Sequence, residues 1–164
     1  MKILTIVRHA KSSWKDASLR DRDRPLNKRG KRDAPMMGKR IQGYGIRPSL
    51  IVSSPANRAW TTAKAVAKEL SYPREFLQRD DRLYLASLDD ILDVVVSQDE
   101  GFNSLMLVGH NPGLTTFVNF LSPGLTHNLP TAGVVSVRID QDHWNLYERP
   151  ETELAVHDWP KKRH

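Results

Sequence analysis

The sequence predicts an α/β protein, a three-layer α/β/α sandwich with a mostly parallel, mixed central sheet. Short apolar, β-branched runs alternate along the chain with segments whose apolar residues recur at helical spacing. The short runs are apolar throughout, as expected for strands covered by helices on both faces. The last two predicted strands follow each other without a helix between them, so we expect antiparallel pairing at one edge.

Length and composition limit the domain organisation and the possible chemistry of the chain. A chain of 164 residues is typical of one domain, and we assign residues 1–159 to it, with a short basic tail at 160–164 that we expect to fray. The formal net charge is 25 − 19 = +6. The chain has no cysteine, which excludes disulfides, thiolate metal sites and cysteine nucleophiles.

In the first part of the chain, residues 3–7 form a β-branched run that predicts a buried strand. Residues 11–27 are polar and without period, which predicts a long loop of the kind that usually has a function. Asn27 is predicted to cap the following helix. Pro35 lies inside that helix, which tolerates it only if the helix bends or starts later. The predicted buried stripe of the helix is Ala34, Met37 and Ile41.

A second buried strand is predicted at residues 50–52. Ser54 then has the character of an N-cap, and Pro55 that of a first helical residue. A further short strand is predicted at 75–77. The apolar stripe of the helix after Pro55 is Ala59, Ala63, Val66, Ala67 and Leu70.

The second half repeats this alternation. Residues 105–108 predict a buried strand, and Asn111 and Pro112 again predict a cap and a first helical residue. The final strands are predicted at 134–139 and 144–147, joined as a hairpin. Two helices are predicted from apolar stripes, one of Leu88, Ile91, Leu92 and Val95 and one of Leu114, Phe117, Val118 and Leu121.

Chemically capable side chains follow three of the predicted strands. Arg8 and His9 end the first strand, Arg58 lies near the start of the helix after the second, and His110 follows the strand at 105–108. Ligands of α/β sheets bind at the carboxyl ends of strands, so these four groups are expected to converge on one crevice. Considered one at a time, each histidine could simply make structural hydrogen bonds and each arginine could simply lie in solvent. Together they favour a phosphate site, because arginine forks suit phosphate oxygens and imidazole is a nucleophile near neutral pH.

The motifs around these residues resemble those of a known family. Residues 7–10, which include Arg8 and His9, resemble the Arg-His-Gly signature of the histidine phosphatase superfamily, the phosphoglycerate mutase-like proteins, with Ala10 in place of glycine. Residues 53–63 resemble the second motif of the superfamily and residues 108–112 resemble its third. The segments 24–30 and 83–84 are most similar to the short phosphohistidine phosphatase branch, the SixA type. The resemblance covers about residues 2–140.

The resemblance implies roles for the site residues. His9 would accept the phosphoryl group, Arg8 and Arg58 would hold its oxygens, and His110 would complete the pocket, with no metal or other cofactor. Ser12 matches a family position near the phosphate, and Arg24 is a second candidate in the same loop for contacting the substrate. Asp81 is the nearest match to the general acid of larger relatives, although the short branch has no clear counterpart.

The predicted function is therefore hydrolysis of phosphohistidine or a phosphoester through a phosphorylated His9. The alternatives are a small-molecule phosphatase or sugar-phosphate mutase of the same superfamily, and a basic adaptor that binds phosphorylated partners without turnover. The expected partner is a phosphorylated protein or a small phosphoester. No nucleic-acid partner is expected, because the basic residues are spread and lack interleaved aromatics. No apolar run is long enough to span a membrane, and a cytoplasmic location is expected.

Overall fold

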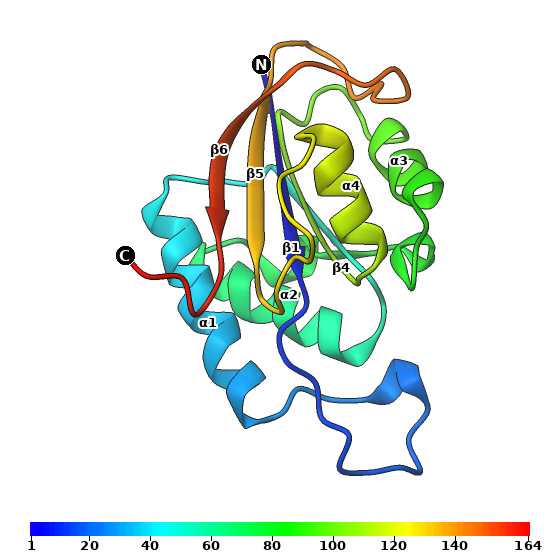
Figure 1. Cartoon of the computed structure of the whole chain (residues 1–164), viewed down its shortest axis with the longest axis vertical. Coiled ribbons are helices and arrows are strands. Elements are labelled where there is room, and N and C mark those ends of the chain that lie inside the picture. Colours follow the sequence, from blue (N-terminus) through cyan, green and yellow to red (C-terminus); the bar gives the residue numbers. More distant parts are fainter.

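The computed structural model describes all 164 residues, and it has a six-stranded sheet with helices on both faces (Figure 1). The strands are β1 (Lys2–Arg8), β2 (Leu50–Ser53), β3 (Gln78–Arg79), β4 (Ser104–Gly109), β5 (Val134–Ile139) and β6 (Thr152–Asp158). The helices are α1 (Lys28–Gly43), α2 (Asn57–Glu69), α3 (Leu88–Val96) and α4 (Gly113–Leu121). Short 3-10 turns lie at Asp21–Asp23, Arg74–Phe76 and Asp81–Leu83.

The strand order is β3-β2-β4-β1-β5-β6. The first four are parallel, whereas β5 is antiparallel to both β1 and β6. This arrangement confirms the predicted three-layer fold with a mostly parallel, mixed sheet. It also makes β1 and β4 neighbours at the centre, with Arg8 beside Gly109 at their carboxyl ends.

The core lies on both faces of the sheet. On β4, Leu105 and Leu107 pack toward α3 and α4, whereas Met106 and Val108 pack toward α1 and α2. Successive side chains of a strand point to opposite faces, so a strand between two helical layers must be apolar at every position. This is why the runs at β1, β2 and β4 were readable as buried strands.

Helix α1 follows the prediction at its start but not at Pro35. Asn27 caps it, with its side-chain oxygen accepting from the Gly30 amide at 2.8 Å. The helix begins at Lys28 and includes Pro35, so it does not start later as one expectation had it. A Cβ on Gly30 would stand 2.1 Å from the carbonyl oxygen of Lys11, so only glycine allows this first turn to approach the chain after β1.

Two other helices begin later than predicted. The N-cap of α2 is Ala56 rather than Ser54, and the N-cap of α4 is Pro112 rather than Asn111. The Ser54 hydroxyl contacts His110 instead. The Asn111 side chain still accepts from the Thr115 amide at 3.2 Å. It therefore satisfies one of the free amide groups in the first turn of α4, although it lies one residue before the N-cap.

Two predicted strands are wrong. Residues 75–77 belong mainly to a 3-10 turn, and β3 lies just beyond them. Residues 144–147 form no strand: Trp144 and Leu146 alternate because both insert into the core, and the Trp144 indole donates to the Phe102 carbonyl. The strand that pairs with β5 is β6, which was missed because most of its side chains are exposed or half-buried and give no apolar pattern.

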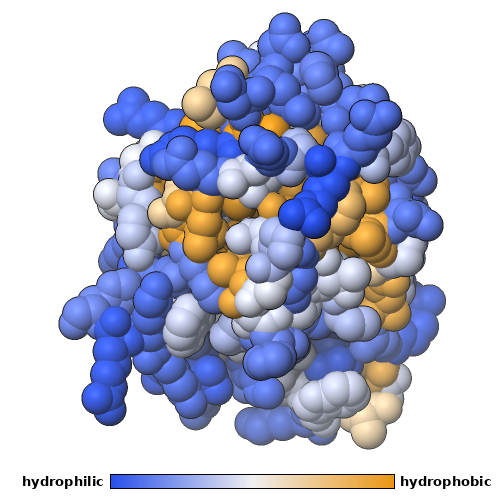
Figure 2. Space-filling model, turned by 45° about the horizontal axis from the view of Figure 1, so that its top comes forward, coloured by the Kyte–Doolittle hydropathy of each residue, from blue (hydrophilic) through white to orange (hydrophobic).

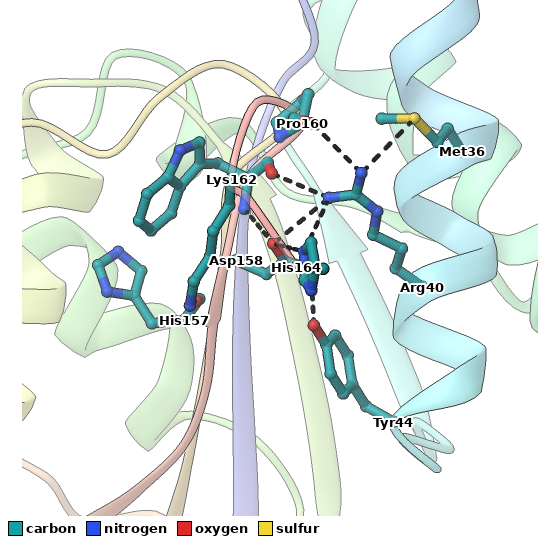
Figure 3. A network of polar contacts seen from close by, with 9 residues as sticks. Met36, Arg40, Tyr44, His157, Asp158, Pro160, Lys162 and His164 are labelled. Carbon is teal, nitrogen blue, oxygen red and sulfur yellow. Dashed lines mark hydrogen bonds and ion pairs between the residues drawn. The ribbon is translucent and has the colours of Figure 1, made fainter.

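The C-terminal tail is held against α1 rather than frayed (Figure 3). Arg40 donates to the carbonyl oxygens of Trp159 at 3.0 Å and Pro160 at 3.2 Å. The carboxylate of Asp158, which is buried, accepts from the Tyr44 hydroxyl at 2.7 Å and contacts the His164 imidazole at 3.0 Å. These contacts join the residues after β6 to helix α1.

Figure 2 brings the end of the molecule that carries the amino terminus toward the viewer. Hydrophilic side chains cover much of this end, with apolar side chains showing between them. None of the helices combines the length and the apolar character that crossing a bilayer requires.

Candidate active site

Two histidines meet at the carboxyl ends of the central strands. His9 directly follows β1 and His110 directly follows β4, and these strands are parallel neighbours. The two imidazole centroids are 5.2 Å apart and the rings are tilted by 55°. Both residues are buried. The pairing of β1 with β4, which are separated by almost 100 residues of chain, therefore creates the centre of the site.

His9 is held in one tautomer. Its Nδ1 lies 2.7 Å from the carbonyl oxygen of Ala10. A carbonyl oxygen can only accept, so Nδ1 carries the proton and Nε2 keeps its lone pair. Burial, together with the nearby charges of Arg58 and Arg8, lowers the pKa of His9 to about 4 against the opposing effect of the Ala10 hydrogen bond. At neutral pH the ring is therefore uncharged and nucleophilic at Nε2.

His110 is also held by one ring nitrogen. Its Nε2 lies 2.7 Å from the Ser54 hydroxyl, which also accepts from the Ala56 amide at 3.2 Å. When the Ser54 hydroxyl donates to Nε2, the ring proton is on Nδ1, which is buried and has no hydrogen-bond partner. Burial, followed by the charges of His9 and Arg58, lowers the pKa of His110 to about 3. In that tautomer the neutral ring presents a free Nδ1–H donor to the site.

Two arginines flank this pair. Arg8 donates from Nη1 to the Leu129 carbonyl at 3.0 Å, and its buried Nε has no partner. Arg58 lies in the first turn of α2 and is also buried. Burial lowers the pKa of Arg8. The Arg8 Nε and His110 Nδ1 atoms are unpaired buried polar groups, which is unusual unless a ligand completes them.

Ser12 and Arg24 lie together at the edge of the site. The Arg24 Nη2 donates to the Ser12 hydroxyl at 2.5 Å, and its Nε donates to the Ser13 carbonyl at 3.1 Å. The guanidinium also stacks on the exposed Trp14 ring at 3.3 Å. The resemblance placed Ser12 near the phosphate, and the sequence predicted Arg24 as a second candidate in the same loop; the structure brings the two side chains into contact, and their role in substrate binding stays a prediction.

Asp81 is not drawn into the site. Its side chain is 87% exposed and contacts Arg22 at 3.7 Å, and it makes no hydrogen bond to either imidazole. The neighbouring Asp80 is bound to Arg82. The role of Asp81 as a general acid stays a prediction, and no contact in the structure supports it. No cluster of three or more His, Cys, Asp or Glu side chains has the arrangement to hold a metal ion.

Sequence reasoning missed Asp21, whose carboxylate and backbone carbonyl bind three residues around the site. Its carboxylate accepts from Arg58 at 2.9 Å, from Tyr84 at 2.5 Å and from Arg24 at 3.0 Å. Tyr84 in turn packs edge-on against the His110 ring at 5.6 Å. The sequence assigned Asp21 no role in the site. Arg58 and Tyr84 lie 37 and 63 residues away, so no local signal could have found these partners.

Comparisons with known proteins agree with this geometry. Residues 4–83 match the model of the histidine phosphatase superfamily, branch 1. An uncharacterized chloroplastic protein of Arabidopsis thaliana is 30% identical over 152 residues, which is 86% of this chain and 68% of that protein.

Solved structures share the whole fold. A protein from Agrobacterium tumefaciens described as a phosphohistidine phosphatase SixA is 26% identical, with a TM-score of 0.81 and coverage of 97% of this chain and 98% of that one. A protein histidine phosphatase SixA complexed with tungstate has the same fold, with a TM-score of 0.78, 22% identity and coverage of 96% of each chain. The chain therefore belongs to the histidine phosphatase superfamily and is a phosphatase, of a family whose reaction passes through a phosphorylated histidine.

Proposed function

We propose that the protein hydrolyses phosphohistidine on a protein partner, with His9 as the nucleophile. The single observation that supports this most strongly is the His9 tautomer, because the Ala10 carbonyl leaves Nε2 with a free lone pair next to two arginines and a second histidine. The similar Agrobacterium protein is described as a phosphohistidine phosphatase, which favours the same substrate here.

In the first step, His9 Nε2 attacks phosphorus and the bond from phosphorus to the substrate nitrogen breaks. The substrate imidazole, protonated on its other ring nitrogen, departs as neutral imidazole. Phospho-His9 keeps its proton on Nδ1, which donates it in a hydrogen bond to the Ala10 carbonyl. Charge on the transferred group spreads over its three outer oxygens, so Arg8, Arg58 and the Nδ1–H of His110 stabilise it by position and charge.

In the second step, water attacks phosphorus and the bond to His9 Nε2 breaks. Both protons of the water leave with the phosphate as H2PO4−, and His9 returns to its neutral form with Nδ1 still protonated. The same hydrogen bond to Ala10 that exposes the lone pair in the first step makes His9 a neutral leaving group in the second.

The state of the carboxylates around the site favours a substrate whose leaving group departs without protonation by an acid. Hydrogen bonding from Tyr84, together with Arg58, lowers the pKa of Asp21 to about 2, so it is ionised at neutral pH. Asp81 faces solvent. An alkyl phosphoester needs a proton on its departing oxygen, whereas a protonated phosphohistidine does not. We infer that phosphohistidine is turned over better than phosphoserine or sugar phosphates.

A basic groove next to the site supports a protein substrate. It has a volume of about 990 Å³ and includes Trp14 and the lysines Lys11, Lys15, Lys28 and Lys31. The ion pairs of the protein involve none of these four lysines. The groove begins two residues after His9, so acidic residues flanking a phosphohistidine would find complementary charge there.

The test is a His9→Ala variant assayed with a phosphohistidine peptide and with p-nitrophenyl phosphate. We expect kcat to fall roughly a thousandfold or more with both substrates, and phosphate trapped on the wild-type protein to map to His9. His143→Ala is the matched control, since His143 lies in the loop after β5, outside the site. Wild-type turnover by His9→Ala would refute the proposal.

The same assay examines Asp81. Because its carboxylate has no contact with the imidazoles, we expect Asp81→Asn to retain kcat within about twofold for both of these substrates, which have good leaving groups, and also for phosphoserine, which has a poor one. A hundredfold loss confined to substrates with poor leaving groups would instead identify Asp81 as the general acid.

A further inference from the structure

Asp21 holds Arg58 at two points. The Arg58 Nη1 donates to the backbone carbonyl of Asp21 at 2.7 Å, and its Nη2 donates to the Asp21 carboxylate at 2.9 Å. A guanidinium has five N–H donors in one plane, so this grip uses its outer end and fixes the direction of the whole plane. The Arg58 Nε donates to no protein acceptor, which leaves the Nε edge for a ligand.

The same carboxylate joins two more parts of the site. It accepts from Arg24, which is bound to Ser12 near the nucleophile, and from Tyr84, whose ring lies against His110. One side chain on the loop between β1 and α1 thus ties together that loop, the start of α2 and the segment after β3. Its negative charge also offsets the repulsion between the two guanidinium groups that it bridges.

We propose that Asp21 is the positioning residue of this active site, holding Arg58 by its outer nitrogens so that the Nε edge of the guanidinium faces the phosphoryl group. This inference rests on the proposed function and adds to it a residue that does not touch the substrate. It follows that Asp21 acts through Arg58, and that removing the carboxylate costs activity by freeing the guanidinium to turn.

A rival interpretation of the same contacts gives opposite results. If the carboxylate occupied the place of a phosphoryl oxygen, it would compete with substrate, and its removal would tighten oxyanion binding. The positioning role predicts weaker binding, since an arginine that must be ordered on each binding event loses its advantage of preorganisation.

The experiment compares Asp21→Asn with Asp23→Asn. Asp23 lies in the same 3-10 turn, and its carboxylate pairs only with the exposed Arg20. With p-nitrophenyl phosphate, we expect Asp21→Asn to lower kcat/KM by about ten- to a hundredfold and to weaken inhibition by tungstate to a similar degree. We expect Asp23→Asn to match the wild type. Unchanged kcat/KM, or tighter tungstate inhibition, in Asp21→Asn would overturn the positioning role.

A double-variant cycle separates positioning from loss of folded structure. If Asp21 acts through Arg58, then Asp21→Asn should cost little more activity in an Arg58→Ala background, whereas losses that multiply would contradict the proposal. Thermal unfolding of each variant identifies any that does not fold, and Asp21→Glu, which keeps the charge, should recover part of the activity. A wild-type protein that shows no phosphorylated His9 would defeat the proposed function, whereas the tungstate comparison would still report on Asp21.

Discussion

At the scale of single residues, His9 and His110 are defined by what surrounds them rather than by their chemistry in water. A free imidazole titrates near pH 6.5. Burial lowers the pKa of His9 to about 4 and that of His110 to about 3. Both rings are therefore neutral throughout the physiological range, which suits a nucleophile and a hydrogen-bond donor. The arginines supply the positive charge that a protonated histidine would otherwise provide.

These pKa values predict how stability depends on pH. The folded-state pKa of each histidine lies below its unfolded value, so between about pH 4 and pH 6.5 the unfolded chain binds more protons. Stability should therefore fall as the pH is lowered through that window, with His9 contributing on the order of 3 kcal/mol between pH 7 and pH 4. Urea unfolding at a series of pH values measures this loss.

A variant isolates the histidine contribution. His9→Gln removes the titrating ring, so the fall in unfolding free energy between pH 7 and pH 4 should be shallower than in the wild type. His143→Ala serves as the comparison, because His143 lies far from this pair in the loop after β5. An equally steep fall in His9→Gln would show that His9 titrates in the folded protein much as it does in water.

At the scale of elements, the contact between α1 and the chain after β1 shapes the site. The Lys11 carbonyl accepts from the Asn27 amide at 3.0 Å, and Gly30 lies directly against it. This contact closes the base of the loop that carries Ser12, Asp21 and Arg24. The position of three site residues thus depends on a helix that supplies none of them.

Gly30→Ala tests this dependence. Its Cβ would stand 2.1 Å from the Lys11 carbonyl oxygen, so backbone must move, and we expect a loss of about 1–3 kcal/mol in unfolding free energy together with reduced kcat/KM. Gly43→Ala, at the other end of α1, has open space around the new methyl group and should be neutral or slightly stabilising. Equal stability and activity of the two variants would contradict this account.

At the scale of the whole molecule, part of the surplus of positive charge is concentrated in the basic groove. The lysines at 11, 15, 28 and 31 lie beside the site, whereas exposed lysines at 39, 68 and 161 lie outside the groove. A small phosphoester reaches only the pocket, but a protein substrate also covers the surface around it. Charge in the groove should therefore affect the two kinds of substrate differently.

Charge reversal measures this difference. We expect Lys15→Glu/Lys28→Glu/Lys31→Glu to raise KM about tenfold for a phosphohistidine protein with acidic flanking residues, in a salt-dependent way, and to leave p-nitrophenyl phosphate turnover unchanged. Lys39→Glu/Lys68→Glu/Lys161→Glu makes the same change in net charge outside the groove. If both triple variants behave alike, then overall charge rather than the groove governs recognition.

The sequence by itself determined the fold class, and it predicted the four central residues of the candidate site. Strands buried on both faces must be apolar at every position, and so β1, β2 and β4 and the groups that follow them, His9, Arg58 and His110, could be identified directly. The exposed edge strand β6 gave no such pattern. Residues 144–147 gave a misleading one, because Trp144 and Leu146 are inserted into the core without strand pairing.

Only the tertiary structure decided how the site is held. The contacts of Ser54 with His110 and of Asp21 with Arg58 and Tyr84 join residues 37 to 63 positions apart. Local sequence patterns report burial and capping, which depend on neighbours along the chain. A hydrogen bond across the fold depends on where the folded backbone brings each side chain, and in this protein that geometry also sets the tautomer of His9 and the charges of the site.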